Sequence, residues 1–284
     1  MPDKILVSWD RLKWFKHDRG ICLREKNVLR TIQSLTNAKS VFVDVGAHIG
    51  FYTVRLALRC KHVHAVEPNP ENAYILRRNL ELNNIKNVTV HQCACGRTRS
   101  KAKIYIADTC TTLIPRTGRK TIEVDVKPLD SLVKYCDIVK IDVEGFEEEV
   151  LLGAENLITH VKPIWVIEHH DKGLGIQYYP ETKGMSERIR KMLSDYIKIT
   201  FDEGRSAYIH KSKINQVPKH ALRRLITLGV HHHVLTNIIE GRAWYYGLPY
   251  TWWYGMSMLD FMEEVYFHVI EEPEWMKIAE EPVM

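Results

Sequence analysis

The feature that most constrains this chain is the segment from Val41 to Gly50, where a run of β-branched residues breaks at glycines. This pattern predicts a strand, a tight turn and a helix that begins near Tyr52. Such a turn brings backbone N–H groups and a helix N-terminus close to a ligand. A second apolar segment, His62–Glu67, ends in an acidic side chain about 20 residues further on, which suits the hydroxyls of a ribose. Together the two segments predict a nucleotide-like ligand.

The sequence of the turn indicates which of two ligands, a dinucleotide or S-adenosylmethionine, it would bind. It reads Gly46-Ala-His-Ile-Gly50 and lacks the G-x-G-x-x-G spacing that cradles a dinucleotide pyrophosphate. Asp44 is expected to project into the site, where its carboxylate would repel a pyrophosphate and hold the cationic amino group of S-adenosylmethionine. We therefore expect S-adenosylmethionine rather than a dinucleotide. The residues expected to contact it are Asp44, Gly46, Ala47, His48, Gly50 and Glu67.

Length and composition bound the number of domains. The chain has 284 residues, of which 45% are hydrophobic and 26% are charged, as in an ordinary globular protein. This length allows one α/β domain with an appendage, or two small domains. The net charge of +5 permits an anionic partner such as nucleic acid but does not require one, because surface lysines alone produce such a value.

The cysteines and the N-terminus bear on the compartment. Six cysteines are scattered without C-x-x-C pairing, and Cys60, Cys93 and Cys136 fall in or beside predicted core segments. Reduced core thiols of this kind are typical of a cytoplasmic protein. The first residues lack the apolar segment of a signal peptide, and no long apolar run precedes the C-terminal tail. We expect a cytoplasmic protein without a transmembrane segment.

Strands and helices alternate through residues 41–212, which predicts one α/β domain with a mainly parallel sheet. Two final segments, Tyr196–Thr200 and Ser206–His210, predict an antiparallel strand pair that closes this sheet. Residues 1–40 and 213–284 are expected to form extensions on either side of the domain.

Several helices and strands can be placed within the domain. A helix is predicted to start at Asn69, with Pro70 in its first turn, and a second helix is predicted over Phe146–Ile158. A smaller antiparallel pair, Lys103–Ala107 with Thr121–Val126, flanks a polar loop. The parallel strands are predicted at Val41–Val45, His62–Glu67, Val88–Cys93, Asp137–Glu144 and Pro163–Glu168.

A pair of carboxylates stands at the end of one predicted central strand, in the run Lys140-Ile-Asp-Val-Glu-Gly145. Side chains two residues apart on a strand point the same way, so Asp142 and Glu144 are expected to face one crevice together. In open α/β sheets, ligands bind at the carboxyl ends of the strands. Paired carboxylates there serve as a general base or bind a divalent cation. The alternative is that Glu144 only caps the following helix.

The next predicted strand ends in Glu168-His169-His170, which places a carboxylate and two imidazoles beside the same crevice. Histidine is a natural base for a hydroxyl because its ordinary pKa lies near neutrality. We therefore expect His169 to join Asp142 and Glu144 as a catalytic residue. The spacing fits no fixed metal-ligand motif, so a divalent cation has no firm support and no metal ligands are assigned. A solvated surface loop is the alternative for these histidines.

These motifs resemble the FkbM family of S-adenosylmethionine-dependent methyltransferases. The resemblance spans roughly residues 35–210, and its most specific part is the run from Lys140 to Gly145. His48 is a departure, since the family commonly has asparagine there. The matching segments are Phe42–Thr53, Val66–Pro70, Leu129–Leu132, Ile138–Glu147 and Trp165–His169.

The resemblance carries expectations about fold and chemistry. It implies a Rossmann-like class I methyltransferase fold and, for many members, O-methylation of hydroxyls on sugars or natural products. It also implies cofactor contacts at Asp44, Gly46 and Glu67. For Asp142 and Glu144 it implies a role on the acceptor side of the site.

Residues 213–284 lie outside the resemblance and concentrate aromatic side chains. The segment Ala243–Leu259 carries no charge, yet Gly247, Pro249 and Gly255 interrupt it and it falls short of a membrane-spanning helix. Aromatic surface of this kind serves as a clamp on the domain, a contact between two subunits, a substrate lid or a membrane contact. We expect the clamp or a homodimer contact.

The residues together predict an S-adenosylmethionine-dependent O-methyltransferase that acts on a hydroxylated small molecule or a glycan. The expected proton acceptors are Asp142, His169 and Glu144, in that order. One alternative is an RNA methyltransferase whose basic segments Arg97–Lys103 and Arg116–Lys120 reach phosphates, although no nucleic-acid module accompanies them. Another is a catalytically silent scaffold that keeps the cofactor fold and binds the cofactor without turnover. The fold does not name the acceptor.

Overall fold

The computed structural model describes residues 5–8, 10–15, 26–106, 111–171, 177–202 and 204–239. The chain divides into two compact units, residues 1–233 and residues 234–284. Of the second unit, the structure describes only the last residues of helix α8 (Lys219–Ile239). The aromatic segment that the sequence singles out as a clamp or dimer contact lies outside the described residues.

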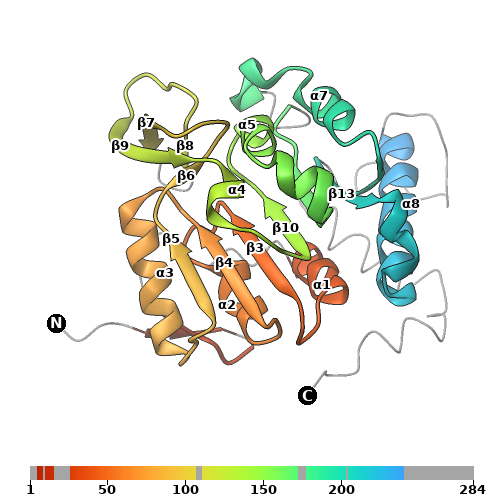
Figure 1. Cartoon of the computed structure of the whole chain (residues 1–284), viewed down its shortest axis with the longest axis horizontal. Helices are drawn as coiled ribbons and strands as arrows, with labels where there is room; N and C mark the ends of the chain where they lie inside the picture. Colours follow the sequence, from red (N-terminus) through yellow and green to blue (C-terminus); the bar gives the residue numbers. More distant parts are fainter. Residues whose placement is uncertain are drawn as a thin grey trace. The chain divides into compact units, whose positions relative to one another are not determined.

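A sheet of seven strands forms the centre of the first unit (Figure 1). Its strands are β3 (Val41–Val45), β4 (His62–Val66), β5 (Val88–His91), β10 (Ile138–Ile141), β11 (Ile164–Glu168), β12 (Tyr196–Asp202) and β13 (Arg205–His210). They lie in the order β12-β13-β11-β10-β3-β4-β5. The strands from β11 to β5 in this order run parallel, and β13 runs antiparallel to both of its neighbours. The predicted α/β fold, with a mainly parallel sheet and an antiparallel closing pair, is confirmed.

Helices cover both faces of this sheet, because successive strand side chains point to opposite sides. One face, which includes Val43 and Ile167, packs against α4 (Leu129–Leu132), α5 (Glu147–Leu152) and α7 (Met185–Met192). The opposite face, which includes Phe42, Val63 and Ala65, packs against α1 (Lys26–Leu35), α2 (Phe51–Ala57) and α3 (Pro70–Leu82). The core therefore lies in two layers, one on each side of the sheet.

Helix α3 begins where the sequence predicts. The side chain of Asn69 accepts a hydrogen bond of 3.0 Å from the backbone N–H of Glu71, and Pro70 occupies the first turn. Ala73 and Leu76 are buried on the inner side of this helix. The cap holds the start of α3 directly after the end of β4, at the edge of the cavity described below.

A smaller sheet contains β6 (Ala94–Cys95), β7 (Ser100–Ile106), β8 (Thr111–Thr112) and β9 (Lys120–Lys127). β7 and β9 pair antiparallel along their whole length, which confirms the predicted antiparallel pair. β6 pairs parallel with β9. Figure 1 shows this sheet beyond the carboxyl end of β5 and β4, where it adds a wall above the large sheet.

Both predicted extensions contribute to the core of the first unit. The hairpin of β1 (Ile5–Val7) and β2 (Lys13–Phe15) places Trp14 among buried residues of α3. Helix α1 and the start of α8 bury Ile32 and Leu225 in the same cluster as β13. The division between the two units falls after His233, within α8. The domain boundaries expected from the sequence stay a prediction.

Two predicted segments end earlier than expected. Strand β10 stops at Ile141, so Asp142 and Glu144 follow the strand instead of belonging to it. The helix predicted over Phe146–Ile158 is broken, because α5 ends at Leu152 and a short π-helix over Leu157–Val161 follows. The break is at Gly153, where an added Cβ would lie 2.2 Å from the backbone oxygen of Gly96. This close backbone approach needs glycine.

The described cysteines are free thiols in the core. Cys60, Cys93, Cys95 and Cys136 are buried without a disulfide, whereas Cys22 and Cys110 lie outside the described residues. In the described part of the chain, no helix combines the length and the apolarity that crossing a membrane requires. The predicted compartment stays a prediction.

Three histidines on β4 and β5 make stability depend on pH. His64 Nδ1 lies 3.1 Å from His91 Nε2, and the rings of His62 and His64 are 4.8 Å apart. Burial, together with the neighbouring His62 and His91, lowers the pKa of His64 from 6.5 to about 4. Burial and the nearby Lys127 also lower the pKa of His91.

We expect the free energy of unfolding to decrease as the pH falls from 6.5 towards about 4. Unfolded chains bind protons on His64 and His91 in that window more readily than the folded protein does, because folding lowers the pKa of both. Urea unfolding of the wild type and of His64→Gln, each at about pH 7 and about pH 5, tests this expectation. The variant should lose less stability at the lower pH. An equal loss in both proteins would contradict it.

Candidate active site

A cavity of about 440 Å³ opens at the carboxyl ends of β3, β4, β5 and β10. This volume lies within the range of roughly 300–1,000 Å³ that small-molecule sites occupy. From β3 the chain continues to β4 on one side, while β10 lies on the other. The cavity therefore lies at the switch point where open α/β sheets bind ligands.

The turn after β3 forms one wall and is tied to the end of β4. The backbone N–H groups of Gly46 and Ala47 both donate to the carbonyl oxygen of Val66 at 3.0 Å. Gly46 has a φ of +84°, and a Cβ there would lie 1.8 Å from the carbonyl oxygen of Asp142. The turn therefore needs glycine, both for its backbone conformation and for the approach of the chain that follows β10.

Glu67 stands at the end of β4 with its carboxylate in the cavity wall. Its Oε2 accepts a hydrogen bond of 2.8 Å from the backbone N–H of His48. Its Oε1 accepts from the backbone N–H of Asn69 at 3.0 Å and from the side chain of Asn72 at 3.2 Å. Burial raises the pKa of Glu67 to about 7, although these hydrogen bonds act in the opposite direction. The position predicted for a ribose-binding carboxylate is thus held in place by three N–H donors.

Asp44 does not line the cavity, unlike Gly46, Ala47, His48 and Glu67. Its side chain is fully buried and accepts a hydrogen bond of 2.7 Å from the hydroxyl of Thr53 on α2. It lies 3.8 Å from the ammonium of Lys140. The expected contact of Asp44 with the cofactor stays a prediction, since Asp44 is covered by Thr53 while Lys140, on the same face of the sheet, lines the cavity. Burial raises the pKa of Asp44, and Lys140 partly offsets this.

Gly50 likewise does not line the cavity. It has a φ of +95° at the start of α2, and a Cβ there would lie 2.4 Å from Leu76 Cδ1. Its role is to close the turn and to let α2 pack against α3.

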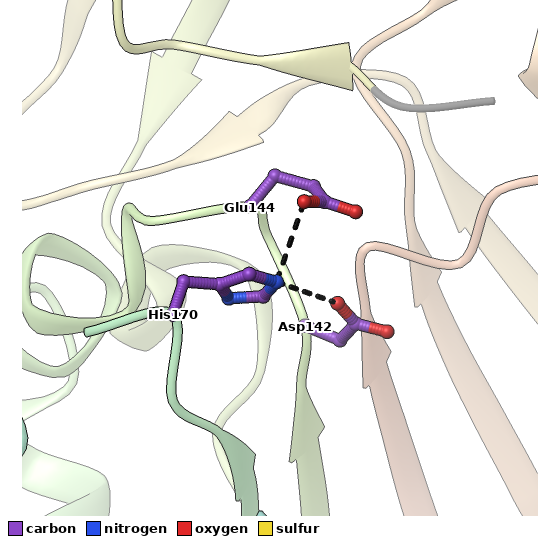
Figure 2. A group of neighbouring side chains, drawn as sticks. All are labelled: Asp142, Glu144 and His170. Atoms are coloured by element: carbon purple, nitrogen blue, oxygen red, sulfur yellow. Dashed lines mark ion pairs between the residues drawn. The ribbon is translucent and has the colours of Figure 1, made fainter. Parts of the chain in front are cut away.

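Asp142, Glu144 and His170 gather beside the cavity (Figure 2). His170 Nε2 lies 3.3 Å from Glu144 Oε2 and 4.0 Å from Asp142 Oδ1. The two carboxylates meet because the chain bends after β10, with Glu144 at a φ of +55°. Hydrogen bonds hold this bend: the hydroxyl of Thr112 donates to the carbonyl of Glu144 at 2.7 Å, and Tyr179 donates to its Oε2 at 2.8 Å. The predicted proximity is therefore present, although a backbone bend produces it rather than strand alternation.

Buried charges surround this group. Lys140 Nζ lies 3.1 Å from Asp142 Oδ2, and Glu147 Oε1 lies 2.8 Å from His170 Nδ1. Burial would raise the pKa of Asp142, but Lys140 and His170 outweigh it and lower the value to about 2. Burial would lower the pKa of His170, but Glu147 and Glu144 raise it to about 12. Asp142 is thus a carboxylate at neutral pH, and in the absence of any bound cation His170 carries a proton.

His169, the predicted catalytic histidine, does not join this group. It is buried beside β13, where its Nε2 lies 3.2 Å from the hydroxyl of Tyr208. Side chains alternate along β11 and beyond its end, so the neighbouring His170 is the one that points towards Asp142. His170 therefore takes the place that the sequence interpretation gave to His169.

Three further residues of the site were not selected from the sequence. Lys140 stands within the motif run, and its burial could be inferred from the apolar strand around it. Glu147 belongs to a run of three glutamates at a helix start, which is typical of a solvated helix end. Tyr179 comes from a loop without a recognisable pattern.

The ionisable groups in the wall favour a cationic ligand. Glu67, Asp142 and Glu144 supply three carboxylates, while Lys140 supplies one ammonium. S-adenosylmethionine carries a sulfonium and an amino group, and these positive charges suit this set of carboxylates. A dinucleotide pyrophosphate would meet repulsion along the same wall.

A family model, the methyltransferase FkbM domain, matches residues 44–197. The chain is 28% identical over 147 residues to "Methyltransferase 1" of Beauveria bassiana. The aligned region covers 41% of this chain and 59% of that protein. The chain therefore spans less than two thirds of that relative. It is 29% identical over 187 residues to the "Hexuronic acid methyltransferase AglP" of Haloferax volcanii, covering 63% of this chain and 74% of that protein.

Among solved structures, the methyltransferase FkbM from Methylobacillus flagellatus is similar to this chain. The two share 21% sequence identity with a TM-score of 0.45, over 61% of this chain and 44% of the other.

Proposed function

We propose that this chain, which belongs to the FkbM methyltransferase family, transfers a methyl group from S-adenosylmethionine to a hydroxyl of a sugar or similar small molecule. The observation that carries this proposal is the cavity at the sheet's switch point. It joins a glycine turn, a ribose-type carboxylate and a second pair of carboxylates in one wall.

The cofactor side of the site is formed by the turn after β3 and by Glu67. S-adenosylmethionine, when bound, supplies an electrophilic methyl group on a sulfonium. The backbone of Gly46, Ala47 and His48 would lie against it, and Glu67 would accept hydrogen bonds from its ribose hydroxyls. Asp44 contributes indirectly. Its carboxylate lies 3.8 Å from the ammonium of Lys140, and that ammonium forms an ion pair with Asp142 at 3.1 Å.

The acceptor side is formed by Asp142 and Glu144. Both side chains line the cavity, and both are held by groups behind the wall. A hydroxyl that donates a hydrogen bond to Asp142 would be oriented by it and would pass its proton towards this pair. We expect orientation to matter more than base strength, because bringing the reacting atoms into line removes much of the entropic barrier.

The acceptor class rests on two supports. The Haloferax volcanii relative is by name a hexuronic acid methyltransferase, which favours a sugar hydroxyl over other acceptors. The basic segments that would serve an RNA acceptor already contain ion pairs, with Lys101 3.1 Å from Glu123 and Arg116 2.9 Å from Glu181. RNA phosphates would have to compete with these carboxylates.

Replacing Asp142 with asparagine is expected to lower methyl transfer by at least about 100-fold, while changing S-adenosylmethionine affinity far less. The substitution keeps the shape and removes the proton acceptor on the acceptor side. Formation of S-adenosylhomocysteine over a panel of sugars, sugar acids and other hydroxylated molecules measures it. The matched control is Glu149→Gln, which removes a partly buried carboxylate from the first turn of α5 and should keep wild-type rates.

If the Asp142→Asn variant transferred methyl groups at the wild-type rate, the assigned role of Asp142 would be contradicted. Cofactor binding without turnover of any acceptor on the panel would favour the scaffold alternative.

A further inference from the structure

Three donor atoms beside the cavity lie close enough to share one ion. One oxygen each from Asp142 and Glu144 and one nitrogen from His170 lie within 4.8 Å of one another, and His170 Nε2 is 3.3 Å from Glu144 Oε2 and 4.0 Å from Asp142 Oδ1. Ligands that surround one cation at about 2.1 Å are separated by roughly 3 Å, so small side-chain rotations bring these atoms into a coordination sphere. The donors come from two elements, the bend after β10 and the end of β11, which packing fixes relative to one another.

Each donor is oriented by a second group that lies outside the cluster. Glu147 Oε1 holds His170 Nδ1 at 2.8 Å, so that Nε2 points between the two carboxylates (Figure 2). Lys140 holds Asp142 Oδ2 at 3.1 Å and leaves Oδ1 towards His170. Tyr179 donates to Glu144 at 2.8 Å. A carboxylate behind a histidine is the usual support of a metal-binding imidazole, because it fixes the ring and raises its basicity.

The imidazole is what distinguishes this group from an ordinary acidic surface. His170 is only 8% exposed, yet its Nε2 points towards the carboxylates of Asp142 and Glu144 (Figure 2). Burial of a polar ring is costly unless both nitrogens have partners. Glu147 serves Nδ1, and Glu144 Oε2 lies 3.3 Å from Nε2, so a cation held by Asp142 and Glu144 would take the place of a proton on Nε2.

The local charge also favours a cation. Three carboxylates, those of Asp142, Glu144 and Glu147, surround a single imidazole. The ammonium of Lys140 forms ion pairs with both Asp142 and Asp44, so it neutralises only part of this negative charge. Buried charges are normally paired, so this surplus of negative charge calls for a further positive group.

We propose that Asp142, Glu144 and His170 bind one divalent cation. Two carboxylate oxygens and one imidazole suit Mg²⁺ or Mn²⁺ as well as borderline ions such as Co²⁺ and Zn²⁺. Asp142 and Glu144 line the cavity, so the open positions of the ion face it. Resting on the proposed function, the ion would orient the acceptor hydroxyl and favour loss of its proton. Acceptors with two adjacent oxygens, such as vicinal diols or hydroxy acids, would then bind best.

Mn²⁺ is the probe that tests this site, without cofactor or acceptor present. Calorimetric titration of the wild type should show one Mn²⁺ per chain, and Asp142→Asn should weaken it by at least about 10-fold. Glu149→Gln removes the same charge from the first turn of α5, at a residue outside the cluster, and should bind Mn²⁺ as the wild type does. Circular dichroism establishes that each variant is folded.

Pulsed electron paramagnetic resonance of the wild-type Mn²⁺ complex reads the ligands directly. We expect coupling to one imidazole nitrogen, which disappears in His170→Gln. If that variant does not fold, the wild-type spectrum alone decides. No Mn²⁺ binding, binding unchanged in Asp142→Asn, or a spectrum without nitrogen coupling would overturn the proposal. Since S-adenosylmethionine binding is measured separately, failure of the metal site is distinct from failure of the proposed function.

Discussion

Replacing Gly46 with alanine is expected to destabilise the fold by roughly 3 kcal/mol and to abolish cofactor binding. The added Cβ would lie 1.8 Å from the carbonyl oxygen of Asp142 and 2.9 Å from its carbonyl carbon. These are backbone atoms of the chain that follows β10, so no side-chain rotation relieves the contact. The turn after β3 or the bend after β10 would have to move, and both line the cavity.

Gly118→Ala is the matched control for this substitution. Gly118 has a φ of +72°, similar to the +84° of Gly46, but no atom lies within 4 Å of an added Cβ. It therefore carries only the cost of a left-handed backbone, about 1 kcal/mol. Urea unfolding and S-adenosylmethionine titration of both variants make the comparison. Equal losses of stability in the two variants would contradict the close approach at Gly46.

Replacing Glu147 with alanine is expected to cost about 3–5 kcal/mol of unfolding free energy, the range for breaking a buried charge pair. The carboxylate is fully buried. Its Oε1 accepts hydrogen bonds from the backbone of Gly145 at 3.0 Å and of Val143 at 3.3 Å, and it contacts His170 at 2.8 Å. Alanine leaves these buried donors without an acceptor, which is the costly outcome for a hydrogen-bonded group.

Glu149→Ala removes a carboxylate two residues further along the same helix and is the control for Glu147. Its side chain is only partly buried, so the change should stay within about 0.5 kcal/mol. Chemical denaturation of the two variants at neutral pH measures the difference. A small effect at Glu147 would mean that the bend after β10 does not depend on this carboxylate.

The strands and the cofactor side of the site follow from local patterns. The β-branched run of β3, the cap at Asn69 and the acidic end of β4 at Glu67 each have a signature within a few residues, and the structure places all three as predicted. Local signals suffice here because a tight turn and a helix cap are built from neighbouring residues.

The errors arise where the outcome depends on strand alternation and register. Asp44 pairs with Lys140 in the register of β3 and β10, and Thr53 of α2 covers its carboxylate while Lys140 reaches the cavity wall. The register of β10 with β11 pairs Ile141 with Ile167, and continued by three residues it sets Glu144 opposite His170. A single sequence shows neither register, so His169 and His170 could not be distinguished. Glu147 escaped notice because its burial results from tertiary packing alone.

The central claim is that the cavity binds S-adenosylmethionine, and calorimetric titration of the folded wild-type protein tests it most directly. NAD in a parallel titration serves as the dinucleotide control. We predict that S-adenosylmethionine binds at one site per chain and that NAD gives no binding. A folded protein that fails to bind S-adenosylmethionine, or that binds NAD equally well, would contradict the assignment of this site.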